Sequence, residues 1–161
     1  MRFFGRTPER PPPADVYDGL RRQVLELTPE QLGVADAEIL ALLMETGYPE
    51  AVATLVAVAD GTTSLYFSNG GGVIGAGAHE SVAAASRRWL ELASTLLPQL
   101  ATVTETPLPA EGETQFVAVV RDELRGVVAT EAELGSGDHA LSPLFFAGHD
   151  VITQLRLAGG G

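Results

Sequence analysis

The sequence has no cysteine and no lysine, and each absence excludes a class of chemistry. Without cysteine the chain forms no disulfide, thiol nucleophile, iron–sulfur cluster or thiolate zinc site. Without lysine it has no P-loop, because that motif places a lysine beside the bound phosphates. All ten basic residues are arginine, against 21 acidic residues, and the net charge is −11. A field of that sign repels phosphate backbones, so we expect no nucleic-acid partner.

Long apolar runs are also missing. No run approaches the ~20 residues of a membrane-spanning helix, and the first residues lack the apolar core of a secretory signal peptide. We therefore expect a cytoplasmic protein without a membrane partner. At 161 residues, 45% hydrophobic and 19% charged, the composition is typical of one globular domain.

Residues 1–13 are rich in proline and arginine and are predicted to be a flexible tail before a single domain, 14–158. Within this tail, Phe3-Phe4 lies between Arg2 and Arg6. Two interpretations are open: a short docking segment for a protein or a membrane surface, or a frayed terminus, which is common at chain ends.

Apolar spacing predicts three helical stretches before residue 50. The first begins at Asp15 and has one apolar stripe, made of Val16, Leu20, Val24 and Leu27. Thr28 and Gln31 form a capping-box pattern around a short second helix that ends at Gly33. A third helix is expected from Asp36 to Gly47, because apolar residues recur four apart there.

Alternation with period two begins after residue 50. Residues 51–58 and 62–68 are predicted to be strands joined by an Asp60-Gly61 turn, a dipeptide that tolerates positive φ. Both faces of 51–58 are apolar, which is typical of a strand covered on both sides. Residues 114–121 and 124–130 predict a second hairpin.

A long helix is expected over 78–97 and a last helix from Ser142-Pro143, with loops at 101–113 and 135–138. Strands in hairpins imply antiparallel pairing. The predicted fold class is therefore α+β, an antiparallel sheet with helices packed on it.

The most conspicuous motif is the glycine-rich run between the return strand and the long helix. Its candidate ligand-binding residues are Gly70, Gly71, Gly72, Gly75, Gly77, His79 and Glu80. A loop that precedes a helix can hold an anion or nucleotide on its main-chain N–H groups. The spacing is not the G-x-G-x-x-G of dinucleotide-binding folds, and glycines equally serve a sharp bend.

Three histidines, His79, His139 and His149, each adjoin a carboxylate and are weak candidates for a metal site. None has the H-E-x-x-H spacing, and helix capping or packing explains them equally well. Ser136, which lies close to Asp138 and His139, lacks the G-x-S-x-G context of a nucleophile elbow. We expect no cofactor and no metal, and an enzyme is the less favoured reading.

Several strings resemble a family of small uncharacterised bacterial proteins, a resemblance that implies no particular activity. They are Val16-Tyr17-Asp18-Gly19-Leu20-Arg21, Leu43-Met44-Glu45-Thr46-Gly47-Tyr48-Pro49, Asp60-Gly61-Thr62-Thr63-Ser64-Leu65-Tyr66-Phe67, Gly70-Gly71-Gly72 and Leu141-Ser142-Pro143-Leu144-Phe145-Phe146-Ala147-Gly148-His149.

The element order also resembles the roadblock/dynein-light-chain-7-like domains, through the 51–68 hairpin, the helix from 78 and the 114–130 hairpin. That resemblance implies a roadblock- or profilin-like sandwich that commonly dimerises and binds small GTPases. The extra helical material at 15–34 departs from it, and a fold does not determine a function.

Two functional hypotheses follow. The first is a non-enzymatic regulatory or protein-interaction domain, with a protein partner or a second copy in a homodimer. The alternative is a small-ligand protein or enzyme, binding an anion or nucleotide at the glycine-rich loop 69–80.

Overall fold

The computed structural model describes residues 10–33, 36–73 and 79–160. In this part of the chain seven strands form one antiparallel sheet, in the order β4-β3-β2-β1-β6-β7-β5. They are β1 (Ile39–Gly47), β2 (Val52–Val58), β3 (Thr63–Phe67), β4 (Gly72–Val73), β5 (Ala101–Val103), β6 (Glu113–Val120) and β7 (Glu123–Thr130). The expected α+β class is confirmed.

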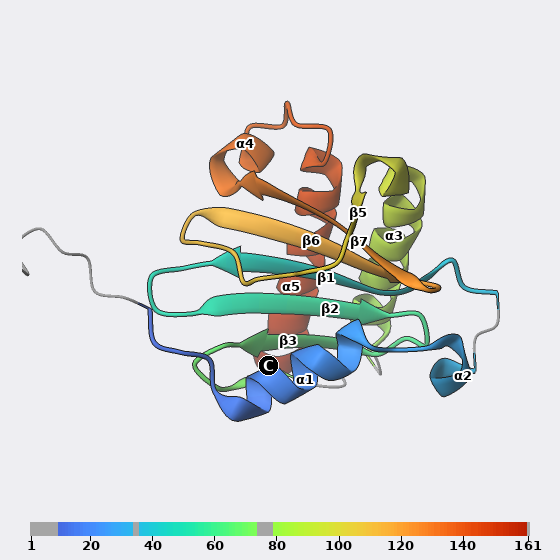
Figure 1. Cartoon of the computed structure of the whole chain (residues 1–161), viewed down its shortest axis with the longest axis horizontal. Helices are drawn as coiled ribbons and strands as arrows, with labels where there is room; N and C mark the ends of the chain where they lie inside the picture. Colours follow the sequence, from blue (N-terminus) through green and yellow to red (C-terminus); the bar gives the residue numbers. More distant parts are fainter. Residues whose placement is uncertain (1–9, 34–35, 74–78, 161) are drawn as a thin grey trace, which may run out of the picture.

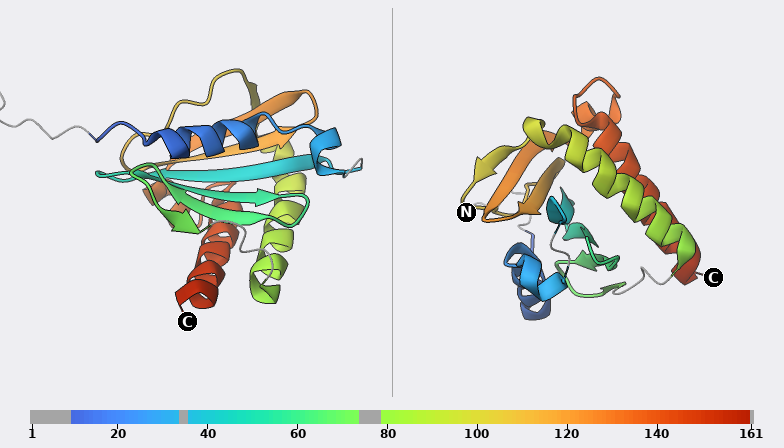
Figure 2. Two further views of the ribbon diagram at one scale, coloured as in Figure 1. Left: turned by 90° about the horizontal axis from the view of Figure 1, so that it is seen from below. Right: turned by 90° about the vertical axis from the view of Figure 1, so that its right-hand side faces the viewer.

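Helices cover both faces of the sheet (Figures 1 and 2). They are α1 (Asp15–Leu25), α2 (Pro29–Leu32), α3 (Glu80–Leu96), α4 (Glu131–Gly135) and α5 (Ser142–Gly160), with a 3₁₀ turn at Leu97–Gln99. The helices α3 and α5 pack side by side on one face, and α1 lies on the other. None of the helices in the described segments is long and apolar enough to cross a membrane.

The third predicted helix is wrong, because residues 39–47 form the central strand β1. All nine residues of this strand are buried, since β1 pairs with β2 and β6 and is covered on both faces. A strand that is apolar on both sides contains apolar residues four apart by default. Periodicity alone therefore does not distinguish such a strand from a buried helix.

The other helices and strands expected in the first half are confirmed, but the predicted apolar stripe of the first helix is partly wrong, because Val16 is 64% exposed, Leu27 lies beyond α1, and Tyr17 is buried instead. Thr28 accepts from the Gln31 backbone, the reciprocal bond of the capping box is present, and Gly33 ends α2 in the left-handed region at φ +69°. Gly61 has φ +101° in the turn between β2 and β3. The short strand β4 begins at Gly72, inside the glycine-rich run that the sequence predicts to be a loop.

The second half adds two corrections. The predicted loop at 101–113 begins with strand β5, and residues 131–135, for which no helix is expected from the sequence, form helix α4. Thr130 caps α4, and Glu133 completes a second capping box. The Thr130 backbone N–H donates to the Glu133 carboxylate and lowers its pKa.

The core divides into two halves, one on each face of the sheet. Trp89 of α3 is fully buried in the larger half, and its Nε1 donates to the Leu144 carbonyl of α5 at 3.0 Å. The smaller half lies beneath α1, where Tyr17 and Val24 pack on β1, β2 and β6. This second half also contains a buried charge.

That charge is Glu45, which is 0% exposed near the end of β1. Arg21 of α1 forms a bidentate ion pair with it: Nε donates to Oε2 at 2.6 Å, and Nη2 donates to Oε1 at 2.9 Å. Thr54 and Gln115 each donate to the same carboxylate at 3.0 Å. A buried ion pair with every oxygen hydrogen-bonded is the arrangement in which attraction can offset desolvation.

The same network also holds the segment 104–112, which connects β5 to β6 across this face (Figure 1). Arg21 Nη2 donates to the Thr106 carbonyl at 2.6 Å, and Gln115 Nε2 donates to the Pro107 carbonyl at 3.0 Å. Burial would lower the pKa of Arg21, but the hydrogen bonding to Glu45 and the charge of that carboxylate outweigh burial and raise it.

Arg21→Met is expected to lower the free energy of unfolding by about 3–5 kcal/mol, because it leaves the Glu45 carboxylate buried and unpaired. The double variant Arg21→Met/Glu45→Met should lose less than the single variant. Urea denaturation followed by the fluorescence of the single tryptophan, Trp89, measures both.

Arg88→Met is the matched control. It removes an exposed pair with Asp150 at 3.4 Å, and such pairs contribute about 1 kcal/mol or less. If Arg21→Met lowers the free energy of unfolding no more than Arg88→Met does, the buried pair does not stabilise the fold.

Candidate functional site

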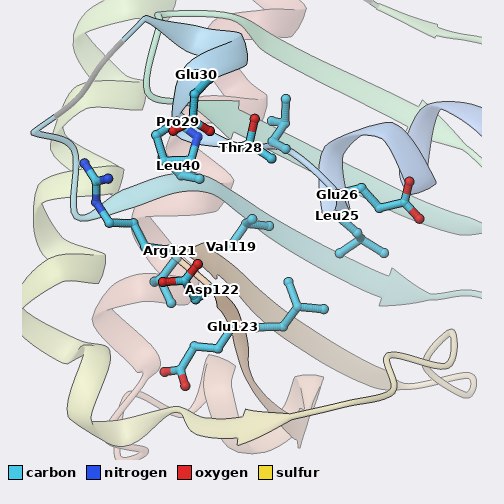
Figure 3. A pocket seen from close by; sticks show the side chains of 13 residues that line it. Leu25, Glu26, Thr28, Pro29, Glu30, Leu40, Val119, Arg121, Asp122 and Glu123 are labelled. Carbon is cyan, nitrogen blue, oxygen red and sulfur yellow. The ribbon is translucent and has the colours of Figure 1, made fainter.

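A pocket of about 380 Å³ lies between the α1–α2 connection and the β6–β7 hairpin (Figure 3). Its lining residues are Leu25, Glu26, Leu27, Thr28, Pro29, Glu30, Leu40, Val119, Val120, Arg121, Asp122, Glu123 and Leu124. We call it the acidic pocket.

Two turns position the acidic pocket. One is the α1–α2 connection, held by the Thr28 capping box. The other is the two-residue turn after Val120, which Asp122 makes in the left-handed region at φ +66°. Aspartate is among the few non-glycine residues that adopt this conformation readily. Ile39 pairs with Val120, which places the second turn at the start of β1, and the α1–α2 connection lines the same pocket beside it.

The floor of the acidic pocket is apolar. Leu40 and Val119 are buried there, and Leu25, Leu27 and Leu124 are half-buried. In Figure 3 the side chains of Leu25 and Val119 lie between the labelled acidic residues. An apolar group that enters would therefore displace water from aliphatic surface, which is favourable.

Exposed charges surround this floor: Glu26, Glu30, Asp122 and Glu123, with Arg121 as the one basic residue of the lining. Glu123 is engaged with Arg125 at 3.4 Å and Thr102 at 3.3 Å. Within the described segments the other three carboxylates have no hydrogen-bond or ion-pair partner. Carboxylates around an apolar floor suit a ligand that combines an apolar group with positive charge.

Part of the predicted glycine site lines a second pocket, of about 200 Å³, which we call the glycine pocket. Gly70, Gly71 and Gly72 line it together with Val16, Tyr17, Leu20, Tyr66 and Phe67. The other two candidates, Gly75 and Gly77, lie outside the described residues. The side chains that line this pocket are aliphatic and aromatic.

Gly72 also has a structural role. A Cβ at this position would lie 2.2 Å from the Leu65 carbonyl oxygen of the paired strand, and its φ is +141°. Any side chain at Gly72 would therefore disturb the β3–β4 pairing, whether or not the loop binds a ligand. Val16, 64% exposed on α1, is the better position for testing the glycine pocket.

The remaining candidates lie elsewhere. His79 is the N-cap of α3 but makes no side-chain capping bond, and Glu80 begins the helix; both are exposed.

The other two histidines have local contacts. His139 accepts from the Leu141 backbone at 3.0 Å through Nδ1. His149 lies on α5 with its ring 4.5 Å from that of Phe145. Burial lowers the pKa of His149, which the Glu131 charge partly opposes.

The fold does not bring these groups together. In the described parts of the chain no cluster of three or more His, Asp or Glu side chains is arranged to hold a metal ion. The Ser136 hydroxyl donates to the Glu133 carbonyl and accepts from the Asp138 backbone N–H. Both bonds are local, so the hydroxyl stabilises the turn in which it lies.

Reasoning from the sequence missed the acidic pocket. The two turns that build it are both visible there, as the capping box at Thr28 and the polar pair Asp122-Glu123. Their meeting depends on β1, which places them at one end of the sheet. A helix over residues 36–47, as the sequence pattern predicts, would not bring the two turns together, so the sequence does not predict this pocket.

Comparison with known proteins adds no relative. No family model matches the chain, and searches of curated proteins and of solved structures find no similar protein. The resemblance to roadblock-like domains therefore remains a prediction from element order.

Tyr17 connects the glycine pocket to the buried charge. Its hydroxyl lies 2.7 Å from Thr54 Oγ1, and because the Thr54 proton is directed to Glu45, Tyr17 is the donor. Burial and, to a smaller extent, the Glu45 carboxylate together raise the pKa of Tyr17 to about 12.

Since the folded pKa lies above the ordinary value of 10, the unfolded chain loses this proton first. The Tyr17 contribution to stability should be complete below pH 10 and lost as pH rises from 10 to about 12. Tyrosinate absorbance should show a late ionisation that Tyr17→Phe removes. Burial also raises the pKa of Tyr48 and Tyr66, so only the variant isolates this step. Identical late titration in both proteins would contradict the assignment.

Proposed function

We propose that the chain is a non-enzymatic protein-interaction domain. It binds a short partner segment that is apolar at its centre and basic on either side, and the segment occupies the acidic pocket. The observation that supports this most directly is the composition of the pocket, an aliphatic floor with Glu26, Glu30 and Asp122 around it.

The dimensions agree with such a ligand. A volume of about 380 Å³ is near the lower end of typical ligand pockets, roughly 300–1,000 Å³. It accommodates one or two side chains of a peptide rather than a whole folded element. Affinity then comes from the apolar group, while the surrounding carboxylates select for positive charge beside it.

The net negative charge of the whole chain also favours a positively charged partner segment. A net charge of −11 attracts cationic segments over distances of about one Debye length, ~8–10 Å at moderate ionic strength. Association should therefore weaken as salt rises, and an acidic segment with the same apolar centre should be rejected.

The test uses two fluorescein-labelled peptides, Arg-Leu-Phe-Arg and Glu-Leu-Phe-Glu, and fluorescence anisotropy. Only the basic peptide should bind. The variant Glu30→Gln/Asp122→Asn should weaken it about threefold to tenfold, since exposed charge pairs contribute about 0.2–1 kcal/mol each. Asparagine suits the positive φ at residue 122.

Glu91→Gln/Glu105→Gln is the matched control, because it removes two exposed carboxylates that line neither pocket. Its affinity for the basic peptide should equal that of the unmodified chain. Equal binding of both peptides, or no effect of the acidic-pocket variant, would exclude this function for the pocket.

The glycine pocket supports a second candidate, a small-ligand protein with its site at residues 70–72. Its lining of Val16, Leu20 and aromatic residues suits an apolar group better than an anion. Amide chemical shifts separate the two sites: a small-molecule screen that perturbs Gly70–Gly72, and loses the effect in Val16→Gln, would favour this candidate.

A further inference from the structure

We propose that the segment bound in the acidic pocket is residues 2–6 of a second copy of the chain, so that two copies exchange these segments and dimerise. This inference rests on the proposed function and names the partner. The complementary chemistry is present in the sequence itself, where Phe3-Phe4 lies between Arg2 and Arg6.

Charge is distributed along the chain in the way that this pairing requires. Arg2, Arg6 and Arg10 supply three of the ten basic residues within the first ten positions, although the chain as a whole has a net charge of −11. The acidic pocket has the opposite composition, four carboxylates and one guanidinium. An aromatic pair between arginines matches an aliphatic floor between carboxylates.

Geometry favours a second copy over the same chain. Arg10 donates to the Tyr48 carbonyl at 3.4 Å and the Pro109 carbonyl at 2.9 Å, at the far end of β1 from the acidic pocket. The pocket residue Leu40 lies eight residues from Tyr48 along this strand, about 26 Å at ~3.3 Å per residue. Phe4 is six residues from Arg10 and extends at most ~22 Å from it, so only a fully stretched segment would approach its own pocket, whereas a second copy can present the segment without that constraint.

Reciprocal exchange satisfies both pockets at once. If each copy places its segment in the pocket of the other, the contact is the same on both sides and the assembly closes as a two-fold dimer. The second contact then forms within the complex, which strengthens association without further surface.

The expected strength follows from the area. Four phenylalanines that bury ~150–250 Å² each account for roughly 600–1,000 Å², near the low end of specific interfaces. The dimer should therefore depend on protein concentration and weaken with salt, rather than being permanent.

The first experiment titrates the full chain into a peptide of residues 1–10 with fluorescein at its C-terminus. Binding should saturate and weaken at least tenfold in a Phe3→Ser/Phe4→Ser peptide. It should also weaken in the Glu30→Gln/Asp122→Asn protein, but not in Glu91→Gln/Glu105→Gln. Failure of this peptide, while Arg-Leu-Phe-Arg still binds, would overturn the inference and leave the proposed function standing.

The second experiment follows the oligomeric state of the full chain by sedimentation velocity over a range of concentrations. A monomer–dimer equilibrium is expected, with a dissociation constant at least tenfold weaker in the Phe3→Ser/Phe4→Ser chain. A chain that stays monomeric, or a dimer that the variant leaves unchanged, would overturn the exchange.

Discussion

The arrangement of this protein depends on one buried ion pair. Glu45 is charged, fully enclosed and central in the sheet, and Arg21 is the cation that neutralises it. The pair holds three segments that are distant in sequence: helix α1, strand β1 and the 104–112 segment. Apolar packing in its place would be non-directional and would tolerate small shifts of α1. The bidentate pair is directional, so it fixes both the position and the orientation of the helix on the sheet.

Both pockets follow from that fixed helix. Residues from the first half of α1 line the glycine pocket, and Leu25 at its end lines the acidic pocket. A rotation of α1 about its axis would move Val16 and Leu25 together. The two pockets therefore share one helix, and the Arg21–Glu45 pair fixes the position of that helix on the sheet.

Much of the fold could be read from local pattern, because caps, turns and amphipathic stripes are short-range signals. Thr28 with Gln31, the Asp60-Gly61 turn and Ser142 all mark observed boundaries. Strand β1 could not be read, since burial on both faces removes the alternation that identifies a strand. The acidic pocket was hidden for the same reason: its two turns meet through the pairing of Ile39 with Val120, more than eighty residues apart.

That pairing also has a consequence for synthesis on the ribosome. Strands β1, β2 and β3 can form a meander early, but the partner of the other edge of β1 is β6, which begins at residue 113. Until then β1 presents an open edge of nine residues, seven of them apolar or glycine. Such an edge recruits other strands, so the nascent chain passes through an aggregation-prone interval that ends only when β6 emerges.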